Sequence, residues 1–122
     1  MPDSCIILLA HGSKNPQWTA PFRQLCADLR KDLGEHAVHL GFMENAEPGL
    51  LAVAREVMQT PVRKCRFLPL FMAKGAHFYE DIPQQIAEIN KAFPELETEL
   101  LEPIGLHPLF LELMRKVIKL HL

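Results

Sequence analysis

The sequence has no long apolar run and no large excess of charge of either sign. Its 122 residues carry a net charge of -2, which excludes the basic surface that a nucleic-acid-binding protein needs. No apolar segment approaches the about 20 residues that span a membrane. The run at 5–10 is also too short for a signal peptide and no basic segment precedes it, so we expect the chain to remain in the cytoplasm.

Cysteine is scarce, and the motifs of nucleotide-binding and nucleophilic enzymes are missing. Cys5, Cys26 and Cys65 are odd in number and form no C-x-x-C pair, which argues against a zinc ribbon, a redox pair or an iron–sulfur site. All three lie in apolar patterns, so we expect buried thiols. The chain lacks G-x-G-x-x-G and the P-loop pattern. Ser13 lacks the G-x-S-x-G context of a nucleophile elbow.

Short apolar segments alternate with amphipathic ones along the whole chain. The apolar segments predict strands at 5–10, 37–43, 62–71 and 97–101. Pro69 cannot donate to a ladder and predicts a bulge or the end of the third strand. Helices are predicted from Pro16 to Gly34, from Pro48 to Thr60, from about residue 81 to 92, and from Pro108 onward.

Apolar side chains recur at helical spacing in the first and last of these helices. Such stripes predict helix faces that pack on a core. The first stripe comprises Trp18, Phe22, Leu25, Cys26, Leu29 and Leu33. The last comprises Leu109, Phe110, Leu113, Met114, Val117 and Ile118.

The strand–helix alternation predicts the α/β class, with about four mostly parallel strands and helices flanking both faces of the sheet. A chain of this length buries one core, so we expect a single domain over 1–122.

Ligands of open α/β sheets bind beyond the carboxyl ends of the strands. His11, Glu44 and His77 follow three successive predicted strands. Two imidazoles and a carboxylate suit a first-row divalent ion such as cobalt, nickel, iron or zinc, and they leave coordination positions open for a substrate. We therefore predict a metal site at this edge.

Neighbouring residues in the same loops favour an exposed site. Gly12 allows a close approach behind His11, and Gly75 allows an unusual turn within the predicted loop 72–79. Lys14 and Lys74 lie in these loops and can pair with substrate carboxylates. The first loop also precedes a helix N-terminus, whose amides attract anions.

Each predicted ligand also has an ordinary interpretation. A single His after a strand is usually a hydrogen-bonded loop residue, and Glu44 alone could simply be an acidic residue that the helix dipole favours. His107 before Pro108 is expected at a helix cap, with metal binding in reserve. We interpret the remaining histidines as structural or solvated: His36, His39 and His121.

Three segments resemble the motifs of the CbiX-type sirohydrochlorin chelatases. The sequence LLAHGS at 8–13 is similar to their opening strand and loop. GFMENAEP at 41–48 is similar to their second motif. LPLF at 68–71, GAH at 75–77 and DIP at 81–83 together resemble the third, P-x-F-x-x-x-G-x-H-x-x-x-D-I-P. The segment 72–74, Met-Ala-Lys, departs from the usual third loop.

The resemblance implies a Rossmann-like chelatase fold and the insertion of a divalent metal, cobalt first, into sirohydrochlorin. It implies metal binding and catalysis by His11, Glu44 and His77. From their place in the same loops, we expect Ser13, Lys14, Lys74 and Gly75 to contact the substrate. It also implies a homodimer that completes the tetrapyrrole cleft. We expect no membrane partner, and no cofactor beyond the metal substrate. Three alternatives stay open: iron insertion for sirohaem, a carrier that does not turn over, and a structural subunit with a degenerate site.

Overall fold

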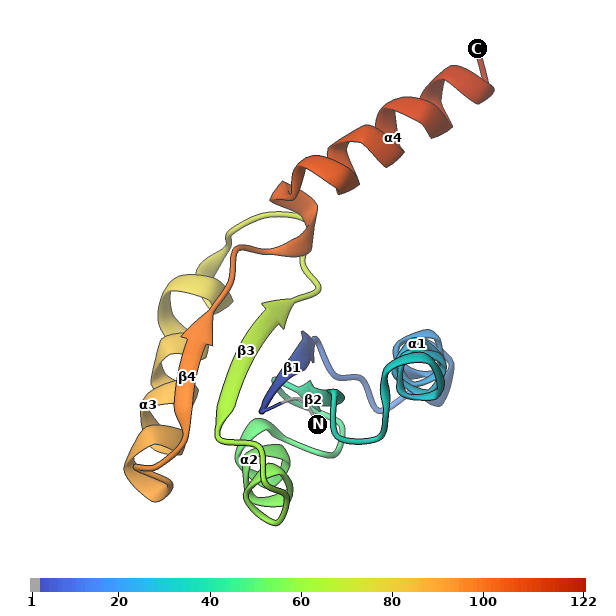
Figure 1. Cartoon of the computed structure of the whole chain (residues 1–122). Coiled ribbons are helices and arrows are strands. Elements are labelled where there is room, and N and C mark those ends of the chain that lie inside the picture. Colours follow the sequence, from blue (N-terminus) through green and yellow to red (C-terminus); the bar gives the residue numbers. More distant parts are fainter. Residues whose placement is uncertain (1–2) are drawn as a thin grey trace.

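The computed structural model describes residues 3–122, apart from the side chain of His77 (Figure 1). Its strands are β1 (Ser4–Ala10), β2 (Val38–Phe42), β3 (Lys64–Pro69) and β4 (Glu97–Leu100). Its helices are α1 (Pro16–Leu33), α2 (Leu50–Met58), α3 (Ile82–Ala92) and α4 (Pro108–Leu120), with a π-helical turn η1 (His77–Asp81) and a 3-10 turn η2 (Ile104–Leu106). Within this described part, no helix is both long and apolar enough to cross a membrane.

The strands form one parallel sheet in the order β2-β1-β3-β4, which confirms the predicted α/β class. Helices α2 and α3 pack on one face, where Ile7, Val53 and Ile89 share a core cluster. Helix α1 packs on the other face, where Leu8 and Cys26 share a second cluster. Because all four strands are parallel, their carboxyl ends lie at one edge of the sheet (Figure 1).

The central strands are buried on both faces, as the continuous apolar run of β1 predicts. Ile7 and Leu8 point to opposite faces and are 0% and 3% exposed. The predicted end of the third strand is confirmed, because Pro69 is the last residue of β3. The three cysteines are free and buried, as predicted.

Both ends of α1 match the sequence signals. The side chain of Asn15 accepts a hydrogen bond from the backbone N–H of Gln17, and Pro16 occupies the first turn. Gly34 ends the helix at φ 106°, a conformation that side chains with a Cβ rarely adopt.

The prediction that the whole apolar stripe of α1 packs inward was wrong. Cys26 is its only buried member, and Trp18 is 71% exposed. Leu25 and Leu33 are exposed as well. The cause is geometric, since α1 lies alone on its face beside β1 and β2 and has no neighbouring helix to cover its flanks (Figure 1).

Two helix starts differ from the prediction. Helix α2 begins at Leu50 rather than at Pro48, because Gly49 before it is extended and the N–H of Phe42 donates to the carbonyl of Pro48. The predicted loop 72–79 ends early, because the N–H groups of Phe78 and Tyr79 both donate to the carbonyl of Gly75. His77 therefore lies in η1, continuous with α3, and not in an open loop.

Helix α4 contradicts the expectation that every helix flanks the sheet. None of its residues is buried, and it extends away from the body of the molecule (Figure 1). Leu109, Leu113 and Ile118 are 74%, 54% and 60% exposed. The apolar stripe predicted from the sequence is present, but it meets little of its own chain.

Candidate functional site

The loops that follow β1 and β2 are in backbone contact at the carboxyl edge of the sheet. A Cβ added to Gly12 would overlap the carbonyl oxygen of Glu44. The N–H of Met43 donates to the carbonyl of Ala10 at 2.9 Å, immediately before His11. Glycine is thus required behind His11, although the close neighbour is the Glu44 backbone and not a ligand.

His11 is exposed at this edge, and its ring stacks on the buried side chain of Phe71. The ring centroids are 4.3 Å apart and the planes meet at 24°. Phe71 follows β3, so the contact joins the loop after β1 to the loop after β3. A cavity of about 340 Å³ lies here, lined by His11, Phe71, Met72 and Gly75 among others.

Glu44 follows β2 and is exposed at the same edge. Asn45 after it has φ 58°, so the chain turns sharply at this point. The side-chain amide of Gln85 on α3 donates to the carbonyl of Met43 at 3.3 Å. Helix α3 therefore helps to hold the segment that carries Glu44.

The predicted third ligand, His77, has its backbone in η1 on the chain segment after β3. Its side chain lies outside the described part of the structure, so the predicted triad of His11, Glu44 and His77 stays a prediction. Among the side chains that are described, no three from His, Cys, Asp and Glu lie close enough together to hold a metal ion.

The four predicted substrate contacts differ in their surroundings. The hydroxyl oxygen of Ser13 accepts a hydrogen bond from the N–H of Asn15 at 3.1 Å and so supports the entry to α1. Lys14 is exposed. Lys74 pairs with Glu102 at 2.9 Å, and this carboxylate raises the pKa of Lys74.

Gly75 does not make the unusual turn that the sequence suggested. Its φ is not positive, and a Cβ added there would meet no atom of the described residues within 4 Å. Its carbonyl instead accepts the two hydrogen bonds that begin η1. The close approach in this part of the edge is at Gly105, where a Cβ would overlap the backbone of Met72.

The structure supports the cap interpretation of His107. Its Nδ1 accepts a hydrogen bond from the N–H of Leu109 at 3.1 Å, which is an N-cap of α4. Sequence reasoning did not single out Phe71 or Glu102 for the site. Phe71 is the specified phenylalanine of the third motif, but nothing in that motif indicates its contact with His11. No sequence signal links Glu102 to Lys74.

Large apolar side chains are exposed near the His11 cavity and in the segments beside it. Met72 is 59% exposed and Tyr79 is 66% exposed. Leu106, in η2, is 43% exposed. The ammonium of Lys74 lies 5.1 Å from the ring centroid of Phe78. The carboxyl edge therefore combines apolar surface with cationic groups.

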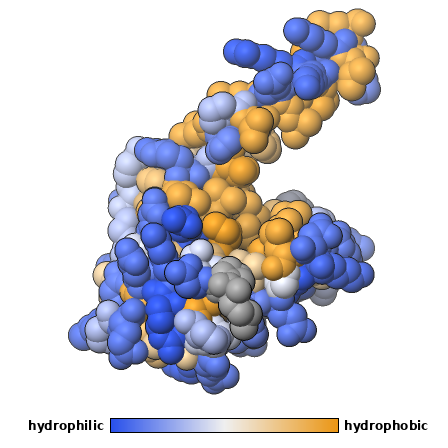
Figure 2. Space-filling model, in the orientation of Figure 1, coloured by the Kyte–Doolittle hydropathy of each residue, from blue (hydrophilic) through white to orange (hydrophobic). Residues whose placement is uncertain are grey.

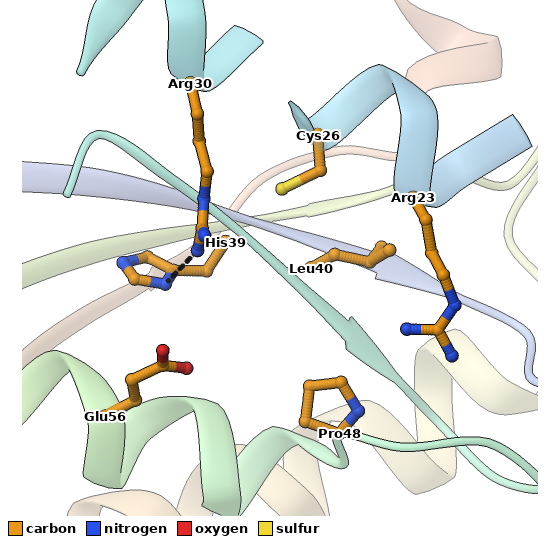
Figure 3. A pocket seen from close by; sticks show the side chains of 7 residues that line it. All are labelled: Arg23, Cys26, Arg30, His39, Leu40, Pro48 and Glu56. Atoms are coloured by element: carbon orange, nitrogen blue, oxygen red, sulfur yellow. Dashed lines mark hydrogen bonds between the residues drawn. The ribbon is translucent and has the colours of Figure 1, made fainter. Parts of the chain in front are cut away.

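A separate cavity of about 270 Å³ lies along β2, between α1 and α2 (Figure 3). Arg30 reaches over from α1, donating through Nε to the carbonyl of Val38 and through Nη2 to Nδ1 of His39 at 3.1 Å. Glu56 approaches from α2. Because Arg30 covers open backbone of an edge strand, its role here is structural.

Burial, and then the positive charge of Arg30, lower the pKa of His39. The side chain is 3% exposed, and its Nε2 has no hydrogen-bond partner among the described residues. With Nδ1 accepting from Arg30, the neutral ring carries its proton on Nε2. His39 is therefore a buried neutral imidazole remote from the carboxyl-edge loops.

The CbiX family model matches residues 5–120. The sirohydrochlorin cobaltochelatase of Sulfurisphaera tokodaii is 32% identical over 113 residues, which cover 91% of this chain and 88% of that protein. The chloroplastic sirohydrochlorin ferrochelatase of Arabidopsis thaliana is 26% identical over 109 residues, which cover 89% of this chain and 48% of that protein.

Two solved structures share the fold. The crystal structure of a putative cobalamin biosynthesis CbiX protein from Marinobacter aquaeolei matches with a TM-score of 0.84 and 30% identity, over 97% of this chain and 96% of the other. The sirohydrochlorin chelatase SirB of Bacillus subtilis, in complex with cobalt, matches with a TM-score of 0.81 and 19% identity, over 95% of this chain and 50% of SirB.

Proposed function

This chain belongs to the CbiX family, and from that membership we propose that it is an enzyme that inserts a divalent metal into sirohydrochlorin. Cobalt is the first candidate, because the Sulfurisphaera relative and several others are named sirohydrochlorin cobaltochelatases. The observation that carries the proposal is that the loops after β1, β2 and β3 contact one another at the carboxyl ends of the strands. The His11 ring stacks on Phe71, and Gly12 lies against the backbone of Glu44.

In this proposal, His11 and His77 bind the metal ion. Glu44 is either a third ligand or a nearby charge that modifies the affinity for the metal. Imidazole and carboxylate together suit cobalt, nickel and iron. The stack on Phe71 fixes the plane of the His11 ring, so its nitrogens keep one direction when water leaves the metal. The metal is a substrate, and the reaction needs no further cofactor.

The macrocycle must lose two pyrrole protons as metal–nitrogen bonds form. A neutral imidazole accepts a proton readily near neutral pH, because its usual pKa is about 6.5. A metal-bound imidazole has no free lone pair, so we assign this role to the histidine nitrogen that the ion leaves as it passes to the ring, with Glu44 as a second acceptor. Holding ion and ring together makes the insertion a local step instead of a bimolecular encounter.

Sirohydrochlorin is a flat ring that carries carboxylates. The carboxyl edge of the sheet offers apolar surface for the ring and positive charge for the carboxylates. Met72 and Tyr79 supply exposed apolar surface, and Lys14 and Lys74 supply positive charge. Lys74 pairs with Glu102 in the free protein. In the complex, a substrate carboxylate would replace Glu102 as the partner of Lys74. Ser13 lies in the same loop as Lys14, and Gly75 in the same loop as Lys74, so both are placed to contact the substrate.

Iron insertion for sirohaem is the second candidate, and one observation favours it: the similar Arabidopsis protein is named a ferrochelatase. The ligand types do not separate cobalt from iron. We further propose that the enzyme acts in the cytoplasm as a homodimer. Support for the dimer comes from length, since this chain matches half of SirB.

A turnover assay separates an enzyme from a carrier. Purified protein at one-hundredth of the sirohydrochlorin concentration is mixed with Co²⁺, and insertion is followed by absorbance. An enzyme converts all of the substrate, faster than a protein-free control. A carrier stops after about one equivalent per protein, and a degenerate subunit gives no conversion above the control; either result would refute the proposal.

Substitution of the histidines tests the assignment of the site. His11→Ala and His77→Ala should each lower kcat/KM by roughly 10²- to 10⁴-fold, the usual range for loss of acid–base groups. His36→Ala is the matched control, because this side chain is exposed and precedes β2, at the opposite end of that strand from Glu44. Normal turnover in both site variants, with an intact fold by circular dichroism, would refute the assignment.

A further inference from the structure

Two of the three cysteines meet in the core, away from the candidate site. Cys5 on β1 and Cys65 on β3 are direct partners in the parallel register of these strands. Their Sγ atoms are 3.2 Å apart and share a hydrogen bond. Both side chains belong to the core cluster on the face covered by α2 and α3. The proposed metal chemistry uses neither thiol, although a thiolate is a strong nucleophile.

The backbone has the spacing that a disulfide needs. Neighbouring strands lie about 4.8 Å apart, and disulfides join residues whose Cα atoms are roughly 4.4 to 6.8 Å apart. The two sulfur atoms must approach from 3.2 Å to about 2.05 Å to bond. Because paired side chains lie on the same face of the sheet, small rotations about the Cα–Cβ bonds of Cys5 and Cys65 can supply this movement.

The third thiol lies apart from this pair. Cys26 on α1 belongs to the core cluster on the opposite face of the sheet, and its Sγ is 4.0 Å from the carbonyl oxygen of Val38. The sheet separates Cys26 from Cys5 and Cys65. The folded chain can therefore form one intramolecular disulfide, and Cys26 is an internal reference thiol.

The hydrogen bond between the two sulfur atoms selects Cys5 as the thiol that reacts first. Donation from the S–H of Cys65 stabilises the Cys5 thiolate and lowers the pKa of Cys5, against the opposing effect of burial. The same hydrogen bond, together with burial, raises the pKa of Cys65, which keeps its proton. Cys5 is also the less enclosed of the two, at 2% exposed against 0% for Cys65.

A small oxidant can reach Cys5 from the amino-terminal end of the sheet. Cys5 is the second residue of β1, and Ser4 before it is half-buried. On the face seen in Figure 2, hydrophilic residues predominate over the lower part of the molecule, where the strands begin (Figure 1). Hydrogen peroxide is little larger than water, so fraying of the first residues of β1 admits it.

We propose that Cys5 and Cys65 form a reversible disulfide when the protein meets a peroxide, and that this bond clamps β1 to β3. The Cys5 thiolate attacks one oxygen of hydrogen peroxide, the O–O bond breaks, and a sulfenic acid and hydroxide form. The sulfur of Cys65 then displaces hydroxide from the sulfenic acid. The thiol protons leave with the two hydroxides, so two thiols and one peroxide give one disulfide and two waters.

The clamp joins the two central strands of the sheet. It closes a loop between residues that are 60 positions apart, and this loop contains α1, β2 and α2. A cross-link of this span restricts the unfolded chain far more than the folded one. Reducing compartments keep thiols in the reduced form, so the oxidised form arises on exposure to peroxide, and a dithiol reductant reverses it.

Thiol counts on the folded chain test the disulfide. Metal-free protein is treated with hydrogen peroxide, denatured and labelled with iodoacetamide. The three thiols of the untreated chain should fall to one, at Cys26, and an unreduced digest should contain a peptide that joins Cys5 to Cys65. Three labelled thiols, a disulfide between chains, or an acid at Cys5 beside a free Cys65 would overturn the proposal.

Two variants show which thiols take part. Cys26→Ser is the matched control, because it removes the thiol on the other face of the sheet and should form the disulfide at an unchanged rate. Cys65→Ala should form no disulfide and should leave a sulfenic acid at Cys5, which dimedone traps. A disulfide in Cys65→Ala, or its loss in Cys26→Ser, would show a different pairing and refute the proposal.

Urea denaturation of the oxidised protein, with and without dithiothreitol, tests the clamp. Dithiothreitol reduces the disulfide, and the two samples share any oxidised methionine, so the comparison isolates the bond. The disulfide form should have an unfolding equilibrium constant lower by roughly 100-fold or more, the usual effect for a long closed loop. Equal stability of the two samples would contradict the clamp. No step uses sirohydrochlorin or cobalt, so the outcome is independent of the proposed chelatase function.

Discussion

At the scale of single residues, the site depends on close backbone contacts between loops. Gly12 lies against the Glu44 carbonyl, and Gly105 lies against the backbone of Met72. These contacts join the loop after β1 to the loop after β2, and the loop after β3 to η2. The positions of His11 and Glu44 are thus coupled through the main chain and not only through a shared ligand.

Gly12→Ala should damage both stability and activity. The new Cβ overlaps the Glu44 carbonyl oxygen, so the two loops must separate. We expect a loss of about 2 kcal/mol or more in the free energy of unfolding, measured by urea denaturation, and slower metal insertion. Gly75→Ala is the control, because nothing among the described residues lies within 4 Å of its added Cβ. Equal stability of the two variants would contradict this account.

His39 should make the stability of the protein depend on pH. Burial lowers its pKa in the folded state, whereas the unfolded chain takes up a proton near the usual value of about 6.5. Stability from this group is therefore present above pH 6.5 and lost as the pH falls below it, by at most about 1.4 kcal/mol per pH unit. The charged groups around it are Arg30, Glu56 and His36.

The variant His39→Gln should flatten this dependence between pH 7 and pH 5, because Gln can still accept from Arg30 but does not titrate. The free energy of unfolding is measured by urea denaturation across the range. His121→Gln, exposed at the end of α4, serves as the control. An unchanged slope in His39→Gln would show that other groups cause the loss at acid pH.

At the scale of elements, both ends of α1 have their own stabilising signals. Asn15 caps its start, Gly34 ends it, and Cys26 is the only buried member of its apolar stripe. Asn15→Ala should therefore lower the free energy of unfolding by about 1 kcal/mol, measured by urea denaturation. Gln24→Ala, in the exposed middle of the helix, should change it by less than about 0.5 kcal/mol. An Asn15→Ala variant whose free energy of unfolding is unchanged would contradict the capping role of Asn15.

Most elements could be predicted because their signals are local. The ends of α1 follow from Asn15 and Gly34, and the end of β3 follows from Pro69. The predictions were wrong where tertiary contacts determine the position of an element. Helix periodicity shows that α4 has an apolar face but not what covers it, and the hydrogen bonds to Gly75 that begin η1 have no sequence signature.

At the scale of the whole molecule, the parallel sheet explains where the candidate site lies. Parallel strands bring His11 and Glu44 to one edge, and this shared edge could be predicted from the alternation of strands and helices along the chain. The stack on Phe71 and the pair between Lys74 and Glu102 could not, because they join loops that are distant in sequence.

The most direct test of the account is a crystal structure of the protein loaded with Co²⁺, with the metal located by anomalous scattering. We predict one ion at the carboxyl edge, bound by ring nitrogens of His11 and His77 at about 2.1 Å, a usual metal–imidazole distance. A metal bound elsewhere, or the two rings facing separate pockets with the ion on neither, would contradict the account.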